Sequence, residues 1–105
     1  MRKKTRHIGR QIRKYIHEID PKTDVILFGS RARGEEGKES DWDILILTDY
    51  PVNAEKERIF RNKLYELELD TGEVFSVFVY SKKEWNTKHR ISPFYQQISQ
   101  EGIRI

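Results

Sequence analysis

The sequence predicts a small α/β or α+β fold, on three observations. Three short apolar runs, at residues 24–29, 41–48 and 73–81, have the length of β-strands. The segments around them place apolar residues at helical spacing. At 105 residues the chain is long enough for one core but not for two, so we expect a single domain over residues 1–105. The order helix, strand, short helix, strand, helix, strand, helix predicts a small layered fold.

The first predicted helix carries one apolar stripe, formed by Ile8, Ile12, Tyr15, Ile16 and Ile19. It ends at Asp20, because the residue before Pro21 disfavours the helical backbone region. Residues 24–29, DVILFG, then predict a buried strand that stops at Gly29.

Residues 30–40, SRARGEEGKES, are polar and have room for at most a short helix that starts near Ser30. The next strand, DWDILILT, covers residues 41–48. Since side chains alternate along a strand, Asp41 and Asp43 share a face with Leu45 and Leu47.

Two interpretations fit the segment after Asn53. With Asn53 as N-cap, residues 54–71 form a helix. Residues 65–80 also alternate, so a hairpin with a turn at residues 70–72 is the other reading, and three acidic residues near the helix end favour it slightly. Length and strong helix formers favour the helix, which we expect to be followed by a strand over residues 73–81.

The last quarter of the chain predicts two further helical segments. Residues 82–85, KKEW, form a short helical turn, and residues 92–102 form a helix that Gly102 closes. Three aromatic residues in this tail, Trp85, Phe94 and Tyr95, fit either the core or a surface for a partner or a second copy.

Composition narrows the functional classes. No run approaches the ~20 apolar residues of a membrane span, and the start lacks the apolar segment of a signal peptide. With no cysteine there is no disulfide or thiolate metal site, so we expect a cytoplasmic protein. The net charge of +3 is concentrated in residues 1–22, which hold eight basic and two acidic residues. Such a segment fits an acidic partner, nucleic acid or, as we favour, a solvated helix face.

The strongest chemical pattern begins where the first strand ends. Gly29 allows a sharp turn and a close approach of the backbone to a ligand. Ser30 opens a helix whose free N–H groups favour an anion, and Arg31 and Arg33 add positive charge nearby. Taken alone, this is half of a phosphate site.

Asp41 and Asp43 supply the other half. Two carboxylates on one face repel each other unless a cation lies between them. Oxygen ligands suit Mg²⁺ or Mn²⁺, which proteins commonly hold with one or two carboxylates and substrate phosphates. The pattern therefore predicts a site for a metal ion and a nucleoside triphosphate.

Gly29-Ser30, ten residues and then Asp41-Trp42-Asp43 resemble the signature of the polymerase-β-like nucleotidyltransferase superfamily. The small size is similar to its minimal members. The resemblance implies a nucleotidyltransferase-like fold, a small mixed sheet flanked by helices. It implies that Gly29 and Ser30 hold the triphosphate, with Arg31 or Arg33 assisting, and that Asp41 and Asp43 bind metal. The implied reaction transfers a nucleoside monophosphate, AMP from ATP, to a hydroxyl acceptor.

The family resemblance also implies a third carboxylate on the strand after the long helix. Here the matching position is Ser76, and Glu73 is the nearest acidic residue. Minimal members typically pair with a helical HEPN-type protein, so the acceptor is expected on such a partner. The alternative is a catalytically weak or inactive antitoxin or binding module. Homo-oligomers are compatible with the sequence, and a nucleic-acid partner is the least favoured hypothesis.

Overall fold

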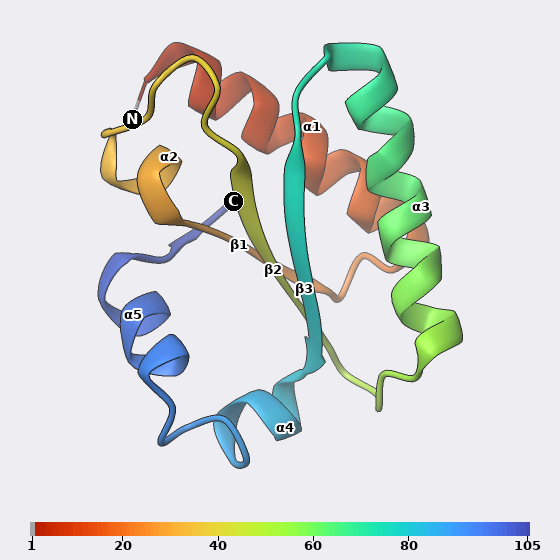
Figure 1. The fold of residues 1–105 in the computed structure, drawn as a ribbon. Helices are drawn as coiled ribbons and strands as arrows, with labels where there is room; N and C mark the ends of the chain where they lie inside the picture. The colour runs from red at the N-terminus through yellow and green to blue at the C-terminus, as the bar shows by residue number, and fades with distance from the viewer. Residues whose placement is uncertain (1) are drawn as a thin grey trace.

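The computed structural model describes residues 2–105, which form five helices and four strands (Figure 1). In chain order these are α1 (Lys3–Ile19), β1 (Asp24–Phe28), α2 (Gly29–Arg33), β2 (Trp42–Thr48), α3 (Ala54–Thr71), β3 (Phe75–Ser81), α4 (Lys82–Asn86), α5 (Pro93–Glu101) and β4 (Ile103–Arg104). Among these residues no helix combines the length and apolar character that crossing a membrane requires.

The four strands form one mixed sheet in the order β3-β2-β1-β4. β2 pairs in parallel with β3, whereas β1 pairs antiparallel with both β2 and β4. A parallel pair needs a long crossover, which α3 provides between β2 and β3. The predicted mixed sheet flanked by helices is confirmed.

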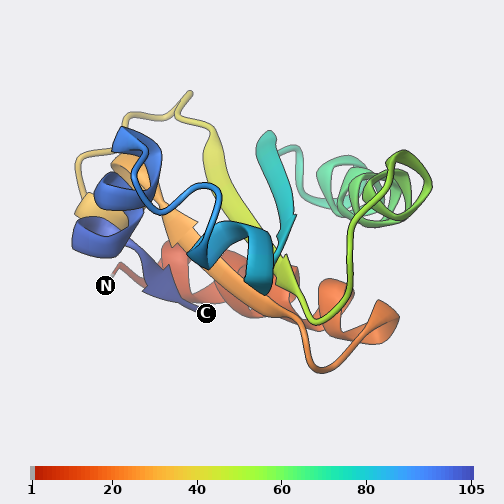
Figure 2. The same ribbon diagram turned by 90° about the horizontal axis from the view of Figure 1, so that it is seen from below.

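α1 and α3 cover one face of the sheet and α4 and α5 the other (Figure 2). Ile12 and Ile16 of α1 and Leu64 of α3 pack against strand residues such as Trp42 and Ile44, and all of these are buried. The second face holds a smaller cluster, formed by Phe28, Leu45, Leu47, Trp85 and Ile98.

The aromatic tail belongs largely to this second cluster. Trp85 is only 5% exposed, and Phe94 and Tyr95 are half-buried and pack against the cluster. These three residues therefore contribute to the core, and not chiefly to a surface for a partner or a second copy.

The helical interpretation of residues 54–71 is confirmed against the hairpin. The Asn53 side chain accepts a hydrogen bond from the Lys56 N–H, and Gly72 ends α3 with φ of 75°. Two of the acidic residues near the helix end have partners: Asp70 accepts from the Tyr15 hydroxyl and Glu68 from the Phe75 N–H. These bonds offset the unfavourable interaction with the helix dipole.

Element boundaries differ modestly from expectation. β3 begins at Phe75 rather than at residue 73, and α2 already includes Gly29. β4 was not expected, because two residues carry no periodic pattern; it forms by pairing with Ile26 and Leu27 of β1.

Candidate functional site

The two aspartates lie where β2 begins. Asp43 is the second residue of β2 and is half-buried, whereas Asp41 precedes the strand and is exposed. Asp43 is opposite Phe28 in β1 and Ser76 in β3. The strand register thus brings Asp43 next to the residue that precedes the Gly29–Ser30 turn.

The turn and Asp43 are in direct contact. Gly29 has φ of 76°, and a Cβ atom at this position would overlap the Asp43 carboxylate. Only glycine fits, both because the left-handed backbone disfavours side chains and because no space exists for one. The two halves of the motif predicted from sequence therefore meet in one place.

Ser30 is half-buried in the first turn of α2, directly after Gly29. It therefore follows directly on the residue that contacts the Asp43 carboxylate.

Arg31 has a different environment from the one expected of a phosphate ligand. Its side chain is 5% exposed, donates from Nε and Nη2 to the Ser40 carbonyl at 3.3 and 2.9 Å, and lies 4.3 Å above the Trp42 ring. It also approaches Glu73 at 3.9 Å. These contacts hold the loop that ends at Asp41. The predicted contact of Arg31 with phosphate stays a prediction, and the buried, engaged guanidinium does not favour it.

Arg33 is exposed, but acidic side chains surround it. Its guanidinium pairs with Glu35 at 2.9 Å and with both carboxylate oxygens of Glu101 at 3.0 and 3.1 Å. Glu101 also accepts a 2.6 Å hydrogen bond from the Gly29 N–H. Sequence reasoning missed Glu101, because no motif connects the end of α5 to a turn 72 residues earlier.

The position of the third family carboxylate holds a hydroxyl. Ser76 is half-buried opposite Asp43, and its Oγ donates to Asp41 Oδ2 at 3.4 Å. Glu73 forms a 2.6 Å ion pair with Lys4, so its carboxylate is engaged with α1. At the three family positions the chain therefore has the carboxylates of Asp41 and Asp43 and the hydroxyl of Ser76.

The electrostatics of the site favour a cation. Burial raises the pKa of Asp43 above its ordinary value, and the negative charges of Asp41 and Glu101 raise it further, while Arg33 offsets part of the effect. A divalent ion beside Asp43 would relieve this repulsion. The described residues contain no cluster of three or more metal-binding side chains. Two carboxylates suit Mg²⁺, which takes its remaining ligands from water and phosphate oxygens.

An aromatic group borders the carboxylates on the same sheet face. The rings of Phe28, Phe78 and Phe94 lie 5.2–5.9 Å from one another. Phe78 remains 36% exposed two residues beyond Ser76. The site thus combines charge at the strand ends with an apolar surface next to it.

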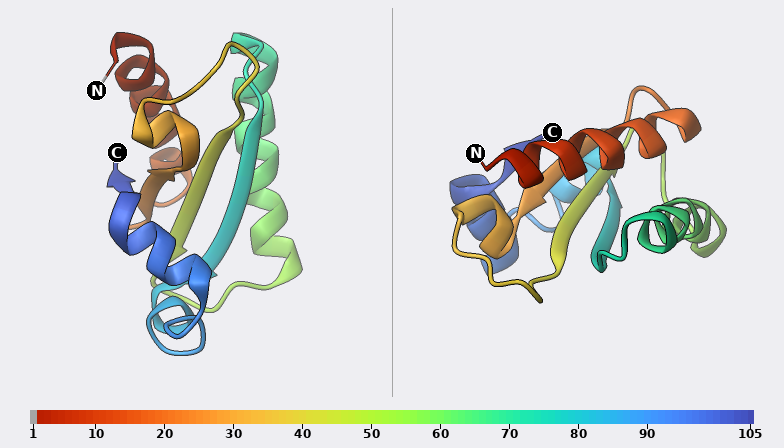
Figure 3. Two further views of the ribbon diagram at one scale, coloured as in Figure 1. Left: turned by 60° about the vertical axis from the view of Figure 1, so that its left-hand side comes forward. Right: turned by 90° about the horizontal axis from the view of Figure 1, so that it is seen from above.

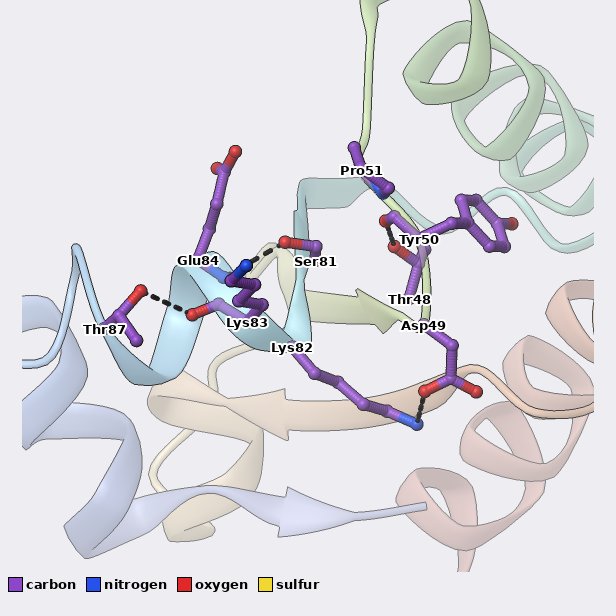
Figure 4. A pocket seen from close by; sticks show the side chains of 9 residues that line it. All are labelled: Thr48, Asp49, Tyr50, Pro51, Ser81, Lys82, Lys83, Glu84 and Thr87. Carbon is purple, nitrogen blue, oxygen red and sulfur yellow. Dashed lines mark hydrogen bonds and ion pairs between the residues drawn. The ribbon is translucent and has the colours of Figure 1, made fainter.

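A cavity of about 500 Å³ lies at the opposite end of the sheet, where β2 and β3 end (Figure 4). Its polar groups bond to one another: Lys82 Nζ to Asp49, Ser81 Oγ to the Glu84 N–H, and Thr87 Oγ1 to the Lys83 carbonyl. Neither Asp41, Asp43 nor the Gly29–Ser30 turn lines this cavity.

The chain matches the family model described as "Nucleotidyltransferase domain" over residues 10–103. A curated protein of Methanocaldococcus jannaschii, "Putative protein adenylyltransferase MJ0141", is 39% identical over 79 residues, which cover 71% of this chain and 78% of that protein. A crystal structure of a toxin–antitoxin with AMP-PNP shares the fold at TM-score 0.63 and 23% identity. A crystal structure of a mutant MntA–HpeT toxin–antitoxin does so at 0.61 and 22%. Each of these two matches covers 91% of this chain and 70% of the matched chain.

Proposed function

The chain belongs to the nucleotidyltransferase domain family, and from that premise we propose that it transfers AMP from ATP to a hydroxyl acceptor in a Mg²⁺-dependent reaction. The family and the relative named as an adenylyltransferase support the activity class. The metal, the nucleotide and the residue roles are parts of the proposal.

One observation carries the assignment of the site: Gly29 lies directly against the Asp43 carboxylate. A triphosphate on the Gly29–Ser30 turn would therefore lie beside a metal held by Asp41 and Asp43. Each half alone is a common feature of proteins. Their contact is what metal-assisted phosphoryl chemistry requires.

The residues of this chain have positional roles in the proposed step. The Ser30 hydroxyl binds a phosphate oxygen, Asp41 and Asp43 hold Mg²⁺ or Mn²⁺, and Arg33 lends positive charge. The bound metal would neutralise charge on the phosphate oxygens. The acceptor oxygen forms a bond to the α-phosphorus, the bond from that phosphorus to the β-phosphate oxygen breaks, pyrophosphate leaves and the acceptor proton passes to water.

We assign the acceptor hydroxyl to a HEPN-type partner protein. The name of the relative is that of a protein adenylyltransferase, and the two solved structures that share the fold are toxin–antitoxin structures. Together with the family resemblance of the Gly29–Asp43 motif, these findings support a protein acceptor over a small molecule.

The test combines binding and transfer. Calorimetric titration of ATP, CTP, GTP and UTP, with and without Mg²⁺, should give binding that needs metal and is lost in Asp41→Asn/Asp43→Asn. ATP labelled on the α-phosphate should then label a co-expressed HEPN-type protein with the wild type but not with Asp43→Asn. Transfer by the Asp43→Asn variant would contradict the proposal.

Ser76 favours a second candidate function. With a hydroxyl in place of the third carboxylate, the Ser76 position offers no side chain that could accept a proton near neutral pH. A catalytically weak or inactive antitoxin would bind metal and nucleotide and its partner without transferring label. Nucleotide binding combined with an unlabelled partner would support this alternative.

A further inference from the structure

One carboxylate connects both ends of α2 to the last helix. Glu101 Oε2 accepts from the Gly29 N–H at 2.6 Å, and both Glu101 oxygens pair with Arg33 Nη1. Gly29 is the first residue of α2 and Arg33 the last. Figure 3 shows α2 and α5 side by side.

α2 needs such external support. It has five residues, and Phe28 at its N-cap offers no side-chain acceptor. A helix this short does not hold its shape on its own, and its first N–H groups have no partner within the helix. Glu101 supplies the missing acceptor from a distant part of the chain.

The backbone around Glu101 is itself fixed to the sheet. β4 follows directly and pairs with Ile26 and Leu27 of β1. A Cβ atom on Gly102 would lie 2.6 Å from the Ile98 carbonyl oxygen and 2.9 Å from Ile26 Cγ2, so the chain passes tightly against β1 here. Glu101 is thus held in register with the strand that leads into the Gly29–Ser30 turn.

We propose that Glu101 is a positioning residue for the nucleotide site: it fixes the Gly29–Ser30 turn and Arg33 in the arrangement that receives the triphosphate. This inference rests on the proposed function. Glu101 accepts from the Gly29 N–H, so in this proposal the phosphate contact falls to Ser30, the next residue of α2. A turn that is already ordered binds phosphate without a further loss of conformational freedom.

Binding of Mg·ATP, measured by calorimetry, tests the inference with three variants. Glu101→Ala removes the acceptor, and we expect it to weaken binding about tenfold or more. Glu101→Gln keeps one oxygen for the Gly29 N–H but loses the charge that pairs with Arg33, so its affinity should lie between those of Glu101→Ala and the wild type. Glu18→Gln is the matched control, because it also removes one charge and one ion pair, with Lys63, away from the site.

A second readout does not depend on nucleotide. Hydrogen exchange of the Gly29 amide should speed up in Glu101→Ala and less so in Glu101→Gln, while circular dichroism shows an intact fold. Should Glu101→Ala not fold, Glu101→Gln against the wild type decides both measurements.

The outcomes separate the two proposals. Variants at Glu101 that bind Mg·ATP as tightly as the wild type, or more tightly, would overturn the positioning role; tighter binding would identify Glu101 as a competitor of phosphate. A wild type that binds no nucleotide, while Gly29 exchange still responds to Glu101, would refute the proposed function and leave a purely structural clamp.

Discussion

Gly29 and Gly34 have the same left-handed backbone, with φ of 76° and 74°, but different surroundings. A Cβ on Gly34 would meet nothing within 4 Å, whereas one on Gly29 would overlap Asp43. Gly34→Ala should therefore cost about 1–2 kcal/mol of stability and leave Mg·ATP binding intact. Gly29→Ala should cost more and also abolish binding, because it displaces the carboxylate.

The comparison isolates the contact between turn and carboxylate, since both substitutions place a Cβ atom at a similar positive φ. Unfolding in urea gives the stabilities and calorimetry gives the affinities. Equal loss of binding in the two variants would mean that backbone conformation, and not the contact with Asp43, governs the site.

The charged Asp43 carboxylate lowers the stability of the fold when no cation is bound beside it. Its raised pKa, caused first by burial and then by Asp41, means that the folded state binds the proton more tightly than the unfolded chain does. Ionisation of Asp43 thus lowers the stability of the fold. The loss begins as pH rises past the ordinary aspartate pKa of about 3.9 and is complete above the raised pKa of the folded state. At neutral pH without metal, Asp43→Asn should raise Tm.

The same variant should lose the stabilisation that ligand gives. For the wild type, Mg·ATP at 100 times its Kd adds about 2.7 kcal/mol, and Asp43→Asn should gain none of it. Thermal melts check both expectations: with EDTA, Asp43→Asn should have the higher Tm, and with Mg·ATP only the wild type should gain in Tm. Asp49→Asn, which removes a carboxylate paired with Lys82 at the other end of the sheet, is the control and should keep the ligand effect.

At the scale of elements, Arg31 couples α2 to the start of β2. Its guanidinium binds the Ser40 carbonyl and stacks on Trp42, so the loop that ends at Asp41 is held from inside. Lysine reproduces neither the forked hydrogen bonds nor the planar stack. We expect Arg31→Lys to cost about 2 kcal/mol and to weaken Mg·ATP binding through Asp41.

Arg61→Lys gives the matched control for Arg31. Arg61 pairs with Glu57 four residues earlier on the outside of α3, where both side chains are largely solvated. Its replacement should change stability by no more than about 0.5 kcal/mol. If Arg31→Lys and Arg61→Lys changed the free energy of unfolding equally in chemical denaturation, the proposal that Arg31 holds the loop before Asp41 would be contradicted.

The elements that the sequence predicted well are those whose apolar pattern repeats. α1, α3 and β3 each bury a periodic set of residues, β1 and β2 are nearly continuous apolar runs, and α5 has a Ser92 cap and a closing Gly102. β4 escaped prediction, because it exists only through its pairing with β1. The same holds for Glu101, whose contact with Gly29 depends on where β4 places the end of α5.

Within the site, sequence spacing predicted the meeting of the Gly29–Ser30 turn with Asp43 but not the environment of each side chain. Arg31 and Arg33 are equivalent in the sequence pattern, yet one is buried on Trp42 and the other is exposed beside Glu101. Which of two neighbouring arginines turns inward is decided by the packing of α2 against β2. Local sequence does not contain that information. The metal and nucleotide contacts of these residues stay predictions.

At the scale of the whole molecule, the sheet presents two different ends. One end carries the carboxylates and the Gly29–Ser30 turn, and the other carries the cavity around Ser81 and Lys83. We expect Lys83→Ala to leave the Kd of Mg·ATP within about twofold, since no part of the proposed site lies there. Ser30→Ala should weaken it about tenfold, because a hydrogen bond to a charged phosphate is lost.

Titration of both variants with Mg·ATP distinguishes the ends of the sheet. If Lys83→Ala raised the Kd of Mg·ATP more than Ser30→Ala did, the nucleotide would bind in the far cavity, and the proposed role of the Gly29–Ser30 turn would be contradicted.

The pairing of β4 with β1 has a consequence for synthesis on the ribosome. Gly29, Asp41 and Asp43 leave the exit tunnel before the Glu101 carboxylate and the strand that anchors it, which come more than fifty residues after Asp43. Until residues 93–104 have emerged, β1 has an open edge and the Gly29 N–H has no acceptor from α5. A nascent chain therefore presents Asp41 and Asp43 before Glu101 can fix the Gly29–Ser30 turn, and we expect the proposed nucleotide site to form only once residues 93–104 have emerged.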